Sequence, residues 1–258
     1  MGILNVTPDS FYAESRVAEQ GVLTKAEQFI KEGVSIIDIG GMSSRPGAKI
    51  ITVEEELKRV LPVIDKIGKE FPDTCLSIDT VHSAVAKAAI DAGASVINDI
   101  SAGEIDPNMF QLVASLENIP YILMHMQGMP ATMQLHPKYE DTALEVLDFL
   151  IEKLGDLRAL GVKDVVVDPG FGFGKTMDQN YELLKKLNTL AMMEVPILVG
   201  LSRKSMIYKF LNISAETALP ATAALHWKAL DEGADILRVH DVKEAVEVVQ
   251  LWCKIREI

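Results

Sequence analysis

Short runs of branched aliphatic residues alternate along the chain with longer segments of helical periodicity. Most of the short runs lack polar alternation, and continuous Ile, Val and Leu are typical of strands buried on both faces. The pattern predicts eight strands, at residues 2–6, 35–39, 75–79, 95–98, 121–125, 165–168, 197–200 and 236–239.

The segments between these runs are expected to be amphipathic helices. They cover residues 23–32, 52–69, 83–92, 108–117, 142–160, 180–192, 215–231 and 242–256. Thr52 is a candidate N-cap, and three glutamates follow it in the first turn, where negative charge favours the helix dipole. Four helices end at a glycine just before a new strand, which is typical of helices that turn back into a parallel sheet.

Eight strand–helix units in 258 residues predict an α/β fold, the (β/α)8 TIM barrel. A doubly wound open sheet is the alternative, but it usually needs fewer strands, and no glycine-rich dinucleotide loop follows the first strand. No linker or low-complexity stretch divides the chain. We therefore expect residues 1–258 to form a single barrel domain.

Composition and charge limit the classes of partner. The formal net charge of −12 opposes non-specific nucleic-acid binding, so an anionic substrate would need a local cluster of cations. No apolar run approaches the roughly 20 residues that cross a bilayer, and the N-terminus lacks the features of a signal peptide. Cys75 and Cys253 match no disulfide framework or metal motif. We expect a cytoplasmic protein that binds neither nucleic acid nor membrane, with a segment preceding the first strand in the full-length protein.

Polar residues follow nearly every predicted strand. In a TIM barrel, chemistry is located in the loops at the C-terminal ends of the strands. A lone Asp there can cap the next helix, an Asn can hold a turn, and a His can be a core residue. Convergence at one rim favours a binding site instead. The residues at these ends are Asn5, Asp38, Asp79, Asn98, His125, Asp168, Lys204, Arg238 and His240.

One part of this rim suits a planar heterocycle with an aminopyrimidine edge. Asp79 and Asp168 can each accept two parallel N–H hydrogen bonds, and such charge-assisted pairs are strong and directional. Asn98 can donate and accept along the adjacent edge. Lys204 can donate to a carbonyl oxygen or a ring nitrogen.

The other part suits an anion. Arg238 and His240 are two positions apart on a strand, so their side chains point to the same face. With Asn5 from the neighbouring first strand, they would form an anion pocket. This pocket could also hold hydrated Mg²⁺ through oxygens of the ligand.

At these residues the sequence resembles the dihydropteroate synthases, a pterin-binding family of TIM barrels. The match runs from Gly2-Ile3-Leu4-Asn5-Val6-Thr7-Pro8-Asp9-Ser10-Phe11 to Arg238-Val239-His240-Asp241. Between these ends lie Asp38-Ile39-Gly40-Gly41, Ser43-Ser44-Arg45-Pro46-Gly47, Ser77-Ile78-Asp79-Thr80, Ile97-Asn98-Asp99, Asp168-Pro169-Gly170, Gly172-Phe173 and Ser202-Arg203-Lys204. Any one motif is weak evidence, but the ordered set is specific.

The resemblance implies a transferase of folate biosynthesis that joins a dihydropterin diphosphate to 4-aminobenzoate in an SN1-like reaction. It implies pterin binding by Asp79, Asn98, Asp168, Lys204, Met124, Phe173 and Gly200. It implies diphosphate binding by Asn5, Arg238 and His240, with Mg²⁺ held at Asn5. The implied 4-aminobenzoate pocket, where sulfonamides act, is Ser44, Arg45, Pro46, Lys204 and Ser205. The implied catalytic residues are Asp79, Lys204, Arg238 and His240, in a homodimer.

Two departures from the family pattern bear on these roles. Ala13 stands where the family has an acidic residue that helps to order the first loop, and Glu14 is the nearest substitute. The second loop reads Met42-Ser43-Ser44-Arg45, where the family more often has Glu-Ser-Thr-Arg. Loop closure and contacts to 4-aminobenzoate are therefore expected to differ.

Three alternatives remain open. A methyltetrahydrofolate-type methyltransferase barrel shares the pterin carboxylates, but would lack the Ser-Arg-Pro-Gly loop and the Arg-x-His pair. A Schiff-base aldolase would use Lys204, although its lysine normally lies on a strand among apolar groups. A non-catalytic pterin-binding paralogue is the third alternative, and Ala13 is the feature that favours it.

Overall fold

The computed structural model describes residues 1–6, 16–43, 47–130, 132–135 and 137–257. Its strands all pair in parallel. The first six form one sheet in chain order, and the last two form another. The strands are β1 (Gly2–Asn5), β2 (Ile36–Gly40), β3 (Cys75–Asp79), β4 (Val96–Asp99), β5 (Tyr121–Met124), β6 (Val165–Asp168), β7 (Leu198–Val199) and β8 (Ile236–Leu237).

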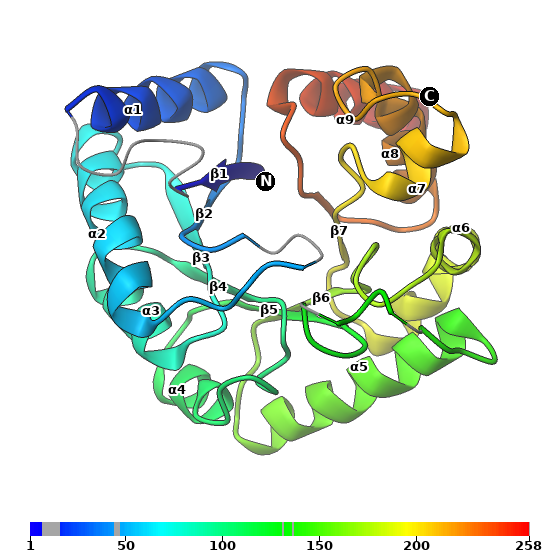
Figure 1. Ribbon diagram of the computed structural model, residues 1–258, viewed down its shortest axis with the longest axis horizontal. Coiled ribbons are helices and arrows are strands. Elements are labelled where there is room, and N and C mark those ends of the chain that lie inside the picture. The colour runs from blue at the N-terminus through cyan, green and yellow to red at the C-terminus, as the bar shows by residue number, and fades with distance from the viewer. Residues whose placement is uncertain (7–15, 44–46, 131, 136, 258) are drawn as a thin grey trace.

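Two single bridges close these sheets into a ring. Gly2 pairs with Val239 beside β8, and Val167 of β6 pairs with Ile197 beside β7. The first seam is held by a hydrogen bond of 2.9 Å from the Ile3 nitrogen to the Val239 oxygen. Figure 1 shows the helices arranged around the strands. The expected TIM barrel is confirmed, with strands β7 and β8 shorter than predicted.

The described helices cover the outside of the ring. They are α1 (Arg16–Lys31), α2 (Val53–Glu70), α3 (Ser83–Asp91), α4 (Met109–Ser115), α5 (Thr142–Ala159), α6 (Met177–Lys185), the 3₁₀ helix η1 (Leu187–Met193), α7 (Ser205–Phe210), α8 (Leu219–Asp231) and α9 (Val242–Arg256). None of the described helices is long and apolar enough to cross a membrane.

Three helix predictions were wrong by three or more residues at one or both ends. The helix predicted at 23–32 begins seven residues earlier, at Arg16. The helix predicted at 180–192 begins three residues earlier, where Thr176 and Gln179 form a capping box, and breaks after Lys185. The helix predicted at 215–231 begins at Leu219, with a proline in its first turn. The short helix α7 before it was missed, because six residues give no clear periodicity.

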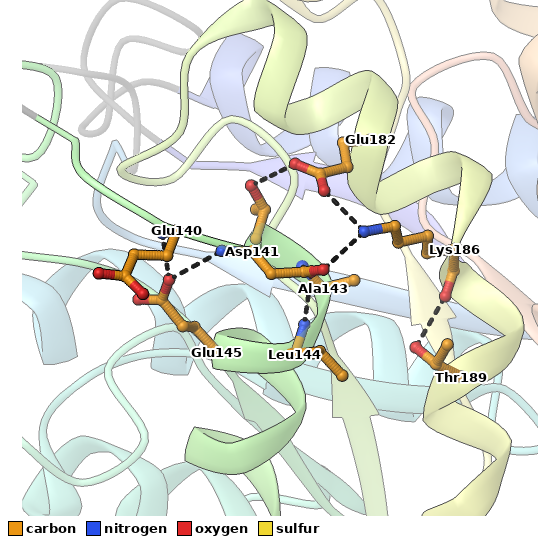
Figure 2. Close-up of polar contacts among 9 residues, drawn as sticks. Glu140, Asp141, Ala143, Leu144, Glu145, Glu182, Lys186 and Thr189 are labelled. Atoms are coloured by element: carbon orange, nitrogen blue, oxygen red, sulfur yellow. Dashed lines mark hydrogen bonds and ion pairs between the residues drawn. The ribbon is translucent and has the colours of Figure 1, made fainter.

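Helices α2, α5 and α6 begin with a side-chain cap. The Thr52 hydroxyl accepts a hydrogen bond from the Glu55 nitrogen at 3.3 Å, as predicted. Figure 2 shows the start of α5, where Asp141 caps two backbone N–H groups and also receives the Lys186 ammonium at 2.7 Å. Lys186 also reaches Glu182 at 2.8 Å. This network ties the start of α5 to the end of α6.

The core is aliphatic, with a separate cluster near the mouth of the barrel. Side chains of Ile37, Ile39, Ile78 and Ile97 are fully buried in the main core. The second cluster lies at or just beyond the C-terminal ends of strands and consists of Met42, Val81, Ile100, Met124, Met126 and Met133, with Phe173 packed against it. Polarizable thioethers therefore line the approach to the polar rim.

Candidate active site

Arg238, directly after β8, contacts residues of two other strands, β2 and β3, at the mouth of the barrel. Its Nε lies 2.7 Å from Oδ2 of Asp38, and its Nη2 lies 2.7 Å from Oδ2 of Asp79. The Asn98 amide donates to the same Asp38 oxygen at 3.0 Å. Asp38, Asp79 and Asn98 are all buried. The structure therefore brings together three predicted site residues around Asp38, to which the sequence analysis assigned no role.

The sequence did contain a signal for Asp38. It interrupts an otherwise apolar strand, Ile36-Ile37-Asp38-Ile39. A carboxylate inside a buried strand needs a partner, because an isolated buried charge is very costly. Its partner comes from β8, 200 positions away.

The charges in this group are unequally balanced, since two carboxylates share one guanidinium. Burial raises the pKa of Asp79 to about 7, the Arg238 charge opposes this, and Asp38 adds to it. Burial also acts against the charge of Arg238, but Asp38 and Asp79 outweigh it and raise the pKa of Arg238. Arg238 therefore remains charged, while the Asp79 carboxyl can exchange a proton near neutral pH.

Asp168 and Lys204 form a second group across the mouth. One oxygen of Asp168 accepts the Gly170 N–H at 2.7 Å. The Lys204 ammonium donates to the Phe171 carbonyl and lies 4.7 Å from the centre of the Phe173 ring. Burial raises the pKa of Asp168, and the Lys204 charge opposes it most strongly. Burial lowers the pKa of Lys204 to about 8.

Arg203 fixes the turn that presents Lys204. It has a left-handed backbone with φ of 52°, which is uncommon for a side chain other than glycine. Its guanidinium pairs with both oxygens of Asp241, at 2.8 and 2.9 Å, and donates to the Ala215 carbonyl at 2.8 Å. This bidentate pair offsets the backbone strain and was not anticipated from the sequence.

Asn5 is the last residue of β1, whereas Arg238 and His240 lie beyond the end of β8 and not on the strand, so the expectation that the strand would direct both side chains was wrong. The His240 ring nitrogen Nδ1 lies 3.1 Å from the Ser202 hydroxyl, and the ring is exposed. Asn5 Oδ1 lies 3.3 Å from the point that a Cβ on Gly40 would occupy, and an Asp79 oxygen lies 3.5 Å from it. Because Gly40 has no side chain, the Asn5 and Asp79 oxygens can both lie close to its backbone, where a Cβ would be crowded.

A metal ion could be held here only with help from a ligand. Among the residues that the structure describes, no group of three or more His, Cys, Asp or Glu could bind a metal. Asn5 offers a single amide oxygen near Gly40 and the Asp79 carboxyl. Mg²⁺ commonly keeps few protein ligands and takes phosphate oxygens from its substrate. The donor set therefore fits a Mg²⁺ ion that arrives with a diphosphate.

The remaining predicted residues are placed as follows. Met124 is buried in the second hydrophobic cluster, against which Phe173 also packs. Gly200 leaves space above Lys204, whose ammonium would lie 3.9 Å from an added Cβ. Ser205 is exposed at the start of α7. Ser44, Arg45 and Pro46, together with Ala13 and Glu14, lie outside the described residues.

The sequence and the fold match known proteins over nearly the whole chain. The family model described as pterin binding enzyme matches residues 1–240. Dihydropteroate synthase of Escherichia coli K12 is 42% identical over 97% of this chain and 89% of the relative, and that of Haemophilus influenzae is 40% identical over 98% and 92%.

Solved structures agree. Yersinia pestis dihydropteroate synthase in a sulfonamide drug complex superposes with a TM-score of 0.93 at 40% identity, covering all of this chain and 94% of that one. The Xanthomonas albilineans enzyme in complex with 7,8-dihydropteroate gives 0.87 at 34% identity, over 100% and 92%. The chain therefore belongs to the pterin-binding enzyme family, among the dihydropteroate synthases.

Proposed function

We propose that this protein condenses (7,8-dihydropterin-6-yl)methyl diphosphate with 4-aminobenzoate to give 7,8-dihydropteroate and diphosphate. The observation that carries the proposal is the Arg238 guanidinium, which contacts Asp79 and whose charge also acts on Asp168 and Lys204. One cation thus links the predicted heterocycle site to the predicted anion pocket.

On the heterocycle side, Asp79 and Asp168 accept N–H groups of the pterin, and Asn98 binds the adjacent edge. Both carboxylates are buried, so their hydrogen bonds to the ligand are protected from water. Lys204 exchanges its bond to the Phe171 carbonyl for one to the pterin. Met124 and Phe173 pack on the ring, and Gly200 permits close approach.

On the anion side, Asn5, Arg238 and His240 bind the diphosphate. A guanidinium has five N–H donors, so Arg238 can serve both carboxylates and a phosphate. Mg²⁺, if held by Asn5 and the diphosphate, would add positive charge next to the leaving group. Ser44, Arg45 and Pro46, with Lys204 and Ser205, are proposed to form the 4-aminobenzoate pocket.

The reaction breaks the bond from the methylene carbon to the diphosphate oxygen and forms a bond from that carbon to the aniline nitrogen, which loses a proton. Departure of the diphosphate leaves a cation that the pterin ring delocalises, so the path is SN1-like. Arg238 and His240 stabilise the leaving charge. Asp79 and Asp168 favour the cationic ring. An aniline in a fixed pocket then needs positioning more than activation.

Release of diphosphate from the dihydropterin substrate, with and without 4-aminobenzoate, tests this function. We expect dihydropteroate to form, and Asp168→Ala or Lys204→Ala to lower kcat by about 10²–10³. Turnover within about threefold of wild type in those variants would contradict the site assignment. Pterin binding without product would instead support the non-catalytic alternative.

Other features stay predictions. Inhibition by sulfonamides is expected because the relative from Yersinia pestis was solved in a sulfonamide drug complex. Homodimerisation and a cytoplasmic location are untested, as is the single domain spanning residues 1–258. The aldolase alternative is disfavoured, because Lys204 lies in a loop, at the residue just before α7, instead of on a strand.

A further inference from the structure

The loop between β6 and α6 is held by side chains at every carbonyl from residue 170 to residue 174. The donors come from three loops around the mouth of the barrel. The Lys175 ammonium donates to the carbonyl oxygens of Gly170 at 3.0 Å and Phe173 at 3.1 Å, and the Lys204 ammonium donates to that of Phe171. The Gln134 amide donates to the Gly172 carbonyl at 2.5 Å, and the Tyr139 hydroxyl donates to the Gly174 carbonyl at 3.0 Å. Five consecutive bound carbonyls leave this loop little freedom to move.

The same loop lies tightly against the loop that follows β5. Gly170 has φ of 69°, and an added Cβ would fall 1.8 Å from the His125 carbonyl oxygen. Gly174 has φ of 63°, and its added Cβ would fall 2.4 Å from the Gln127 carbonyl oxygen. The glycines permit this contact, but they also cost conformational entropy on folding, which other interactions must offset.

Lys175 supplies the central interaction between the two loops. Its side chain is buried, and its ammonium has three N–H donors, which match three neighbours. These are the two loop carbonyls and Nδ1 of His125 at 2.9 Å. Burial, and then the charge of Lys175, lower the pKa of His125 to about 2, so the ring is neutral and Nδ1 can accept. Burial lowers the pKa of Lys175 itself, and the Asp168 charge opposes this. The buried amino group therefore depends on its three hydrogen-bond partners and on Asp168.

The loop held in this way forms one wall of the proposed pterin site. It begins at Asp168, whose oxygen accepts the Gly170 N–H, and it carries Phe173, whose ring lies beneath Lys204. The Lys175 charge also opposes the effect of burial on the pKa of Asp168, after the larger effects of Lys204 and Arg238. Loss of Lys175 would therefore change both the shape and the charge of that wall.

We propose that Lys175 is a positioning residue of the pterin site, which holds residues 170–174 so that Asp168 and Phe173 meet the pterin ring. The proposal rests on the proposed function for the identity of the ligand. It predicts an effect on the pterin substrate that the second substrate, 4-aminobenzoate, does not share. A purely structural lysine would affect both substrates alike.

The test compares two substitutions in the full chain. Lys175→Met removes the charge and all three hydrogen bonds, whereas Lys175→Gln removes the charge but keeps an amide that can donate two. Lys163→Met, at an exposed lysine, is the matched control. Unfolding curves establish that each variant is folded. If the methionine variant does not fold, the glutamine variant decides.

We expect the KM for the dihydropterin diphosphate to rise about tenfold in Lys175→Met and less in Lys175→Gln, with the KM for 4-aminobenzoate within about threefold of wild type. In both variants the acidic limb of kcat/KM should move to higher pH, because Asp168 loses a neighbouring cation. A pterin KM within about threefold of wild type in a folded variant, or an equal rise in both KM values, would overturn the proposal.

Calorimetric titration of the dihydropterin diphosphate into each protein separates this proposal from the proposed function. If wild type binds this ligand but releases no product, the proposed reaction fails, and the ratio of dissociation constants still decides the role of Lys175. If wild type does not bind the ligand at all, both proposals fail.

Discussion

The Arg238 Nη2 atom lies 2.7 Å from Oδ2 of Asp79 and 2.6 Å from Oδ2 of Asp38. A guanidinium can satisfy two carboxylates in this way because its donors are planar and fixed. Asp79 belongs to the proposed pterin site, and Arg238 to the proposed diphosphate site. The two halves of the substrate are therefore expected to be bound by groups that already interact before it arrives.

Replacement of Arg238 by lysine keeps the charge but loses this geometry. A single ammonium cannot reproduce the planar contacts to Asp38 and Asp79 while it also binds a phosphate. We expect Arg238→Lys to lower kcat for diphosphate release by about 10²–10³. Arg256→Lys, at an exposed arginine on α9, is the control and should leave the rate unchanged. Equal rates for the two variants would argue against a role for the bridge.

The activity should fall at alkaline pH because of Lys204. Its pKa is lowered from 10.5 to about 8, mainly by burial, so it loses its charge above that pH. We expect kcat/KM for the dihydropterin diphosphate to decline through about pH 8. In Lys204→Arg this limb should move to higher pH, because arginine stays charged, even if the maximal rate is lower. An alkaline limb at the same pH in both proteins would assign it to another group.

Glu56 gives a prediction about stability. Both of its carboxylate oxygens are buried without a hydrogen-bond partner among the described residues. Burial raises its pKa from 4.5 to about 7, and the nearby Asp79 charge adds to this. The folded protein therefore binds this proton more tightly than the unfolded chain. Its stabilising contribution is complete below pH 4.5 and is lost as the pH rises through about 7.

Glu56→Gln removes this titration without a large change in shape. Relative to wild type, its free energy of unfolding should increase by about 3 kcal/mol between pH 4.5 and 7. Urea unfolding at several pH values measures the difference. Glu152→Gln, at an exposed site on α5, should give a curve parallel to that of wild type. A Glu56→Gln curve that is also parallel would show that the carboxyl titrates normally.

Two glycine substitutions should have opposite effects on stability. Gly170→Ala would place a Cβ 1.8 Å from the His125 carbonyl oxygen in a left-handed backbone. We expect it to lower the free energy of unfolding by about 3 kcal/mol or more. Gly155 lies inside α5, and nothing lies within 4 Å of its added Cβ. Gly155→Ala should therefore raise stability by about 0.5–1 kcal/mol.

Thermal unfolding of the two variants and of wild type tests whether Gly170→Ala lowers the stability and Gly155→Ala raises it. A stable Gly170→Ala protein would mean that the loop after β6 can move away from His125. That result would also weaken the argument that Lys175 holds this loop in a fixed position.

Much of the fold could be predicted from local pattern. The predicted ranges 75–79, 165–168 and 242–256 coincide with β3, β6 and α9. Predicted element boundaries were wrong where contacts between distant parts of the chain determine where a strand or helix ends. Strands β7 and β8 have two residues each, because few ladder hydrogen bonds form near the seams of the barrel. Helix α7 is too short to show a period.

Part of the candidate site could be predicted from the sequence, because polar residues at the ends of predicted strands are expected to meet at one rim of the barrel. Asp79, Asn98 and Arg238 were expected at one rim, and they lie in one hydrogen-bonded group around Asp38. The roles proposed for individual residues await the experiments above. Lys175 could not be found in this way, because a lysine beside a glycine-rich loop normally suggests a solvent-exposed side chain.

The sequence by itself determined the order of strands and helices, the parallel barrel and the residue types presented at its mouth, because these follow from hydrophobic periodicity and from the direction of parallel strands. Only the tertiary structure decided which charges are buried and with what partners. Asp38 meets Arg238 from 200 positions away, and Lys175 meets His125 from 50 positions away. The pKa of a buried group depends on neighbours brought together by folding, and local sequence does not encode their distances.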